Sequence, residues 1–203
     1  MHNRNRKLSV GIAMLFETIL IVTAFLNIAT RQWKNLPLTL LTMVCLILPF
    51  IITHIAIRKK IMLPSGFQFI TLVFIFLAQY LGEIKKFYHI FWWWDLFLHA
   101  IFGSYMVIIA LYSIKGIARK EQDTTERRFT LFVIIFAFSF TIALGTLWEI
   151  FEFVGDYLLK TNMVKGGFED TLTDLLAKAT AAFITSIVCY FHRSEVVYSC
   201  LKD

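Results

Sequence analysis

Acidic side chains and one histidine recur in pairs at helical spacing inside apolar stretches of this sequence. The pairs are Asp95 with His99, Glu149 with Glu152, and Asp170 with Asp174. Spacings of three or four residues place both members of a pair on one face of a helix. Carboxylates with one imidazole are ligands suited to Mg, Mn or Fe, and they do not exclude Zn. The pairs are therefore candidate ligands of a divalent metal ion. For Asp95 and His99, the alternatives are a carboxylate that fixes the imidazole tautomer or a helix cap above a core histidine.

The elements that must position these pairs are transmembrane helices. Of the 203 residues, 58% are hydrophobic and 16% aromatic, and the mean hydropathy is +0.69, whereas soluble domains are about 45–50% apolar. A helix needs roughly 20 apolar residues to cross the bilayer core. Six runs come close to or exceed this length: 8–29, 36–57, 67–84, 93–114, 129–153 and 168–192. We predict an all-α bundle of about six transmembrane helices that forms a single domain over residues 1–203.

The basic residues predict how the bundle is oriented. Most of the 20 Lys and Arg residues fall in the amino terminus, the second and fourth connections and the carboxyl-terminal tail. Because short cytoplasmic loops carry the excess of Lys and Arg, both termini are expected in the cytoplasm. The acidic pairs then lie near the outer face of the membrane. The net charge of +6 fits this bias together with attraction to anionic membrane lipids, and no motif supports nucleic-acid binding.

Charged side chains inside a bilayer cost about 2.5–3.5 kcal/mol each at a helix centre, so they usually contact partners or water and mark function. Asp170 has an ordinary explanation, because acids suit the amino end of a helix. Glu83 has one too, as a solvated helix end. Neither explanation serves Glu149 and Glu152, because negative charge is unfavourable near the carboxyl end of a helix. We expect a cation, a proton or a basic partner against these two glutamates.

Three further residues bear on the site. Lys178 follows Asp174 by four residues, and it either neutralises Asp174 or supplies the buried cation of the outer site. Glu17 lies midway along the first predicted helix, and an ion pair between Glu17 and Lys178 is a structural alternative. Gly103, one turn beyond His99, would let another helix approach closely.

Three motifs, taken in order, resemble a known family. They are Trp94-Asp95-x-x-x-His99-x-x-x-Gly103, Trp148-Glu149-x-x-Glu152 and Asp170-Thr171-x-x-Asp174-Leu175. This succession covers roughly residues 82–183. It resembles the YjdF-type family of bacterial inner-membrane proteins, and it is more distantly similar to VanZ-like proteins, which carry an acid and a histidine on one helix and paired aspartates on a later one. The chain departs from the pattern at Lys178 and Ala181, where an asparagine-like residue and a glycine are expected.

The resemblance implies a multi-pass protein of the bacterial cytoplasmic (inner) membrane. It implies no reaction, because the YjdF-type family is biochemically uncharacterised. VanZ-like proteins are associated with glycopeptide resistance and the cell envelope, again without a settled reaction.

Three classes of function fit these residues. The first is a hydrolase or transferase in which Asp95, His99, Glu149, Asp170 and Asp174 supply ligands for one or two divalent ions. A bound water would then attack a phosphate or acyl group of a lipid-linked or envelope substrate, and Glu149 and Glu152 would be the catalytic carboxylates. The second is a non-catalytic membrane scaffold or partner-binding protein. The third is a proton- or cation-coupled transporter, which is disfavoured because the polar residues gather near one membrane face.

Overall fold

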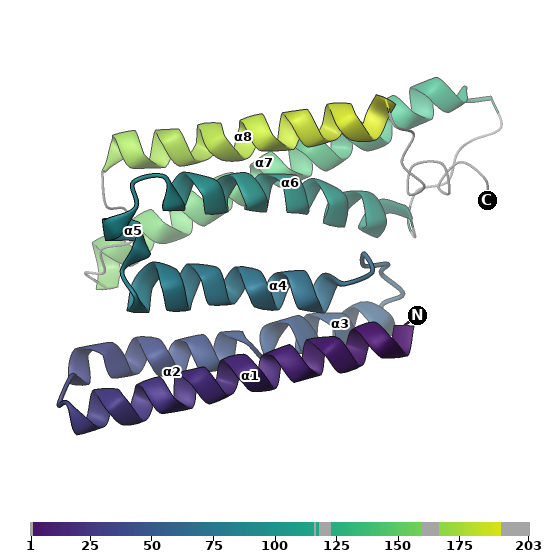
Figure 1. Ribbon diagram of the computed structural model, residues 1–203. Helices are drawn as coiled ribbons and strands as arrows, with labels where there is room; N and C mark the ends of the chain where they lie inside the picture. Colours follow the sequence, from purple (N-terminus) through teal and green to yellow (C-terminus); the bar gives the residue numbers. More distant parts are fainter. Residues whose placement is uncertain (1, 116, 118–122, 160–166, 192–203) are drawn as a thin grey trace. The chain divides into compact units, whose positions relative to one another are not determined.

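The computed structural model describes residues 2–115, 117, 123–159 and 167–191. Within these ranges the chain is helical and contains no strand, which confirms the all-α prediction. Figure 1 shows the helices in chain order. They are α1 (His2–Ala29), η1 (Trp33–Asn35), α2 (Leu36–Cys45), α3 (Leu48–Arg58), α4 (Phe67–Ile75), η2 (Phe76–Ile84), α5 (Phe87–Ile90), α6 (Trp94–Lys115), α7 (Glu126–Leu159) and α8 (Phe168–Phe191).

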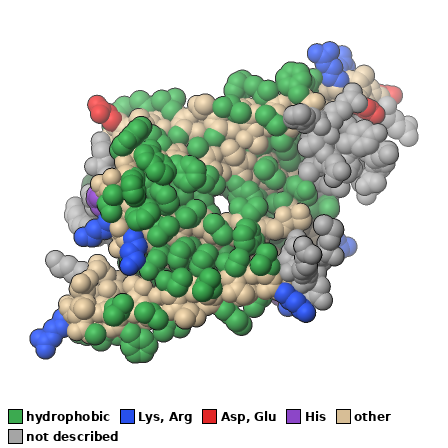
Figure 2. Space-filling model, in the orientation of Figure 1, with side chains coloured by type: hydrophobic (Ala, Val, Ile, Leu, Met, Phe, Trp, Pro, Cys, Tyr) green, Lys and Arg blue, Asp and Glu red, His purple; other side chains and the backbone are tan. Residues whose placement is uncertain are grey.

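Among the described residues, six helical segments are long and apolar enough to cross a membrane. They are Arg6–Ala29, Leu36–Arg58, Phe67–Ile84, Trp94–Ile114, Glu126–Val154 and Phe168–Phe191. Each predicted run coincides with one of these segments, apart from shifts of a few residues at the ends. Many of their large apolar side chains are exposed, and Figure 2 shows hydrophobic side chains over much of the visible surface. Such exposure is unfavourable in water and ordinary in lipid.

The chain divides into two compact units, Met1–Trp94 and Asp95–Asp203. The expectation that residues 1–203 form a single domain therefore stays a prediction. In the first unit, Leu20, Leu46 and Leu72 lie in a buried core. The second predicted helix is interrupted between α2 and α3, where Pro49 lies in the first turn of α3. Proline has no N–H to bond to the carbonyl four residues earlier, so the interruption has a local cause.

The first unit also contains a π-helical stretch, η2, which directly continues α4. Gly82 in η2 lies against the ring of Tyr88, and a side chain at this position would overlap that ring. The stretch carries Glu83, which is half-buried, and α1 carries Glu17, also half-buried. Both of these predicted site residues therefore belong to the first unit.

The second unit contains α6, α7 and α8, which share one apolar core. Its buried members include Val107 and Leu111 from α6, Val133 and Ala137 from α7, and Ala182 from α8. The three helices alternate in direction, so the first turns of α6 and α8 lie at the same end of the unit as the last turns of α7 (Figure 1). The motifs of the sequence analysis occupy these turns.

The residue at which α8 begins determines how far along the helix its acidic residues lie. Gly167 precedes the helix with φ +67°, a left-handed conformation that glycine adopts without steric cost. Its carbonyl accepts a hydrogen bond from the backbone N–H of Thr171 at 3.2 Å, which closes the first turn. Asp170 lies in that turn, where negative charge suits the helix dipole. Asp174 lies one turn deeper and is buried.

Candidate functional site

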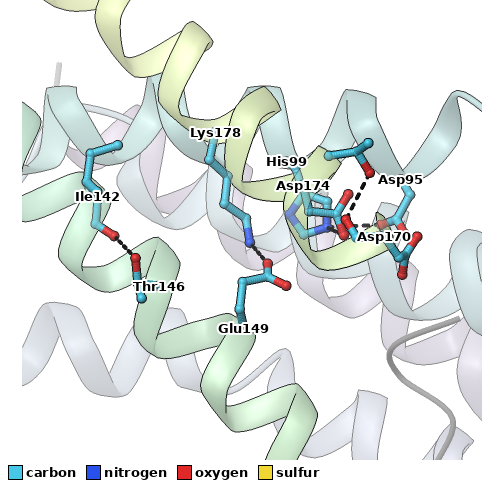
Figure 3. Close-up of polar contacts among 9 residues, drawn as sticks. Asp95, His99, Ile142, Thr146, Glu149, Asp170, Asp174 and Lys178 are labelled. Carbon is cyan, nitrogen blue, oxygen red and sulfur yellow. Dashed lines mark hydrogen bonds and ion pairs between the residues drawn. The ribbon is translucent and has the colours of Figure 1, made fainter. Parts of the chain in front are cut away.

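Two carboxylates converge on one ring nitrogen of His99. The Nε2 atom of His99 lies 3.1 Å from Oδ1 of Asp95, on the same helix, and 3.2 Å from Oδ2 of Asp174 on α8. One ligand atom from each of the three residues lies within 4.8 Å of the other two. Figure 3 shows the three side chains meeting between α6 and α8. The cluster Asp95, His99 and Asp174 is called the ligand trio below.

The geometry of the ligand trio suits a shared cation. A ring nitrogen carries at most one proton, so Nε2 of His99 has one hydrogen to offer to two carboxylate oxygens. Ligands of a single ion with bonds of about 2.1 Å are separated by roughly 3.0–3.4 Å in octahedral or tetrahedral geometry. Both distances from Nε2 fall in that interval, and the two carboxylates offer oxygens within 4.8 Å of each other. The donor set of two carboxylates and one imidazole therefore fits a divalent ion such as Mg, Mn, Fe or Zn.

The ligand trio is more open on one side. The side chain of Asp174 is 5% exposed, whereas that of Asp95 is 26% exposed. Asp95 lies in the first turn of α6, close to the end of the unit. A small molecule or a water would reach the ligand trio from the Asp95 side.

A buried ion pair lies next to the ligand trio. The Nζ atom of Lys178 on α8 bonds to Oε1 of Glu149 on α7, and the two side chains are 3% and 4% exposed. Side chains on a helix lean towards its amino end, so Lys178 extends towards the turns of α8 that carry Asp174 (Figure 3). A cation, a proton or a basic partner was expected against Glu149, and Lys178 is such a basic partner. For Lys178 itself, the alternatives were a pair with Asp174, a pair with Glu17 or a role as the buried cation of the site, and the ion pair with Glu149 agrees with the last of these.

Two glycines make room for Lys178. A Cβ atom at Gly103 on α6 would overlap the backbone carbonyl oxygen of Lys178 and lie 3.0 Å from its Cα atom. A Cβ atom at Gly145 on α7 would lie 3.2 Å from Cδ of the same lysine. The close helix approach expected at Gly103 is therefore confirmed. The second glycine was missed, although Gly145 precedes Glu149 by four residues and thus shares its helix face.

Gly103→Ala is expected to lower the free energy of unfolding by about 1–3 kcal/mol, the usual cost of overpacking. The reason is that the obstructing atoms belong to the backbone of α8 and cannot rotate away. Thermal unfolding in detergent measures the effect. Gly11→Ala is the matched control, because Gly11 is also helical and a Cβ atom added there would meet no atom within 4 Å. Equal effects of the two substitutions would contradict the close packing at Gly103.

The other predicted site residues lie outside the ligand trio. Glu152 is half-buried, receives a hydrogen bond from the Trp148 side chain, and lies within electrostatic reach of Glu149 and His99. Asp170 is half-buried one turn before Asp174. Metal ligation by Glu149 and Asp170 and catalysis by Glu149 and Glu152 stay predictions.

Comparison with known proteins identifies the family. Residues 11–195 match the model of a family described as "Predicted membrane protein (DUF2238)". The chain belongs to this family. DUF2238 is the YjdF-type family, so that resemblance is confirmed, while the similarity to VanZ-like proteins stays a prediction.

A relative of this DUF2238 protein occurs in Thermotoga maritima, where it is described as an uncharacterized protein. The two sequences are 29% identical over 141 residues, which cover 68% of this chain and 66% of the Thermotoga protein. The match thus spans slightly less than two thirds of the relative. No solved structure matches the DUF2238 protein.

Proposed function

We propose that this DUF2238 protein is a divalent-metal-dependent hydrolase or transferase of the bacterial cytoplasmic membrane. Its substrate would be a lipid-linked or other envelope molecule that reaches the ligand trio from the outer leaflet. The convergence of the Asp95 and Asp174 carboxylates on Nε2 of His99 carries the proposal. Ionisable groups inside membrane segments are costly and usually functional, and this group is assembled from two separate helices.

The chemistry follows from the donor set. A divalent ion held by Asp95, His99 and Asp174 would supply a Lewis acid for a phosphoryl or carbonyl oxygen and an acidified water. Asp174 anchors the site from its buried position on α8, and Asp95 borders the side that is more exposed. With one histidine and two carboxylates as protein ligands, further coordination positions remain for water or substrate.

Glu152 would transfer a proton in this reaction. It lies one turn from Glu149 on α7, remains half-buried, and interacts electrostatically with His99. Glu149 is already engaged with Lys178. A carboxylate within electrostatic reach of His99, with the Trp148 side chain as a hydrogen-bond donor, can accept a proton from an attacking water or hydroxyl group. We therefore assign the general base to Glu152 and a charge-pairing role to Glu149.

A non-catalytic scaffold is the second candidate function. It is favoured by the fact that the polar contacts join different helices: His99 connects α6 to α8, and Lys178 connects α8 to α7. Contacts of this kind can hold helices together in a membrane without any reaction. The two candidates differ in whether a metal ion binds.

Metal content tests the proposal directly. Wild-type protein, purified in detergent without chelators, is expected to contain a divalent ion close to one per chain by elemental analysis. His99→Ala is expected to lose most of it, because the variant lacks the one ligand that contacts both carboxylates. His54→Ala is the control, since His54 is an exposed histidine on α3. A wild-type protein that takes up no ion even when Mg, Mn, Fe or Zn is supplied would support the scaffold instead.

The predicted orientation has its own test. In a background in which Cys45, Cys189 and Cys200 are serine, Trp92→Cys is expected to react with a membrane-impermeant maleimide in intact cells. Trp92 is 83% exposed and lies just before α6, at the end of the helix that carries Asp95. Lys60→Cys, in a loop expected in the cytoplasm, should react only after lysis. The reverse labelling pattern would place the ligand trio at the cytoplasmic face.

A further inference from the structure

We infer that the ammonium group of Lys178 takes the place of a second metal ion, so that the site holds one divalent cation instead of two. This inference rests on the proposed function, because it presupposes a metal at the ligand trio. Lys178 would thereby limit the number of bound metal ions to one. The site would be a mononuclear centre with the lysine ammonium beside it.

The first argument is the balance of buried charge. Asp95 and Asp174 carry two negative charges at the ligand trio, and Glu149 adds a third. Lys178 neutralises Glu149 through a direct ion pair in which both side chains are almost fully buried. Among the ligand trio and the buried ion pair, the two remaining charges correspond to one divalent ion, whereas Glu152 and Asp170 are half-buried and have access to water. An uncompensated charge in a buried site is strongly unfavourable. Without Lys178, the same carboxylates would therefore need a further cation to neutralise Glu149.

The second argument is the position of the ammonium. Carboxylate-rich hydrolytic sites often hold two metal ions about 3.5–4 Å apart, and the second ion needs carboxylates next to the first. Glu149 and Glu152 share one face of α7 near the ligand trio and would be the ligands of that ion. Instead, Glu149 bonds to Nζ of Lys178. Figure 3 shows the Lys178–Glu149 pair beside His99 and Asp174, and the charge of Lys178 acts on His99.

The third argument is that Lys178 is held in place. Gly103 and Gly145 pack against its backbone and its side chain, and the ring of Phe102 lies 5.9 Å from Nζ. With a side chain that is 3% exposed, the ammonium cannot turn out to water as surface lysines do. A covalently attached cation stays at this position at any concentration of free metal. A second ion would therefore be excluded even when metal is abundant.

Manganese stoichiometry tests the inference. Full-length protein in detergent is equilibrated with Mn²⁺, and bound ions per chain are counted by electron paramagnetic resonance and elemental analysis. Wild-type protein is expected to bind one ion, and Lys178→Met, which removes the charge at similar length, is expected to bind two. The double variant Glu149→Gln/Lys178→Met removes the pair as a neutral unit and is expected to bind one. A Lys178→Met protein that still binds a single ion would overturn the inference while leaving the proposed function intact.

A second variant covers the case in which Lys178→Met does not fold. Glu149→Gln keeps the lysine and leaves its charge without a carboxylate, so repulsion is expected to weaken Mn²⁺ binding at the ligand trio about tenfold or more. Binding with unchanged affinity would mean that the ammonium does not act on the metal position, and the inference would be wrong. Wild-type protein that binds no Mn²⁺ would instead overturn the proposed function, and this inference with it.

Discussion

Lys178→Met, with Glu149 left in place, is expected to lower the free energy of unfolding by about 3–5 kcal/mol, the usual cost of leaving one partner of a buried ion pair alone. The physical reason is that the Glu149 side chain is 4% exposed and would lose its counter-charge without gaining water. The measurement is unfolding in mixed micelles with a chelator present. The chelator matters, because a metal ion recruited to Glu149 would mask the loss.

The matched comparison is again Glu149→Gln/Lys178→Met, which removes both charges together. Replacing a whole buried ion pair by neutral groups is often close to neutral for stability, so the double variant is expected to be more stable than Lys178→Met by at least about 2 kcal/mol. If the double variant unfolds as easily as the single one, the lysine contributes through packing against Gly103 and Gly145 and not through its charge.

Asp174→Asn is expected to weaken Mn²⁺ binding on the order of a hundredfold, and Asp95→Asn about tenfold, because charge interactions strengthen as water is excluded. Asp174 is 5% exposed and Asp95 26% exposed, so the loss of a charge is less screened at position 174. Both substitutions keep the shape of the side chain. Titration of the purified variants with Mn²⁺ gives the two affinities under the same conditions.

Asp170→Asn is the control for this pair. Asp170 shares the helix face of Asp174 but lies one turn nearer the start of α8 and outside the ligand trio. Its substitution is expected to change Mn²⁺ affinity by less than about threefold, because a partly solvated charge is well screened. An effect of Asp170→Asn as large as that of Asp174→Asn would indicate that the metal ion binds one helical turn nearer the start of α8 than the ligand trio.

The helices were predictable from the sequence because each is a continuous apolar run bounded by polar residues. Local pairs were predictable for a similar reason: the spacing between Asp95 and His99 places both on one face of α6 whatever else the chain does. The structure confirms this contact at 3.1 Å. A contact between two residues of one helix can be predicted because the hydrogen-bonded backbone fixes their relative positions.

Contacts between helices were harder to predict. Asp170 and Asp174 occupy one stripe of α8, and only the level at which α8 packs against α6 decides that Asp174 meets His99. The pairing of Lys178 with Glu149 likewise depends on the rotation of α7 about its own axis. Neither the packing level of α8 nor the rotation of α7 can be deduced from the spacing of residues along the sequence. The spacing from Gly145 to Glu149 was the available signal, since a small residue one turn before a carboxylate leaves room for a long side chain on the facing helix.

The position of Asp174 along α8 bears on how a substrate of the proposed enzyme would arrive. Asp174 lies six positions after Phe168, the first residue of that helix, which corresponds to about 9 Å of helix rise. In the proposed function, a substrate that enters past Asp95 would therefore have to extend below the membrane surface to meet Asp174. A lipid already carries its linkage region near that level and can diffuse sideways within the leaflet, whereas a freely soluble compound would first have to shed its hydration. Diffusion within the leaflet would thus favour substrates with hydrocarbon tails before any side chain of the ligand trio contacts them.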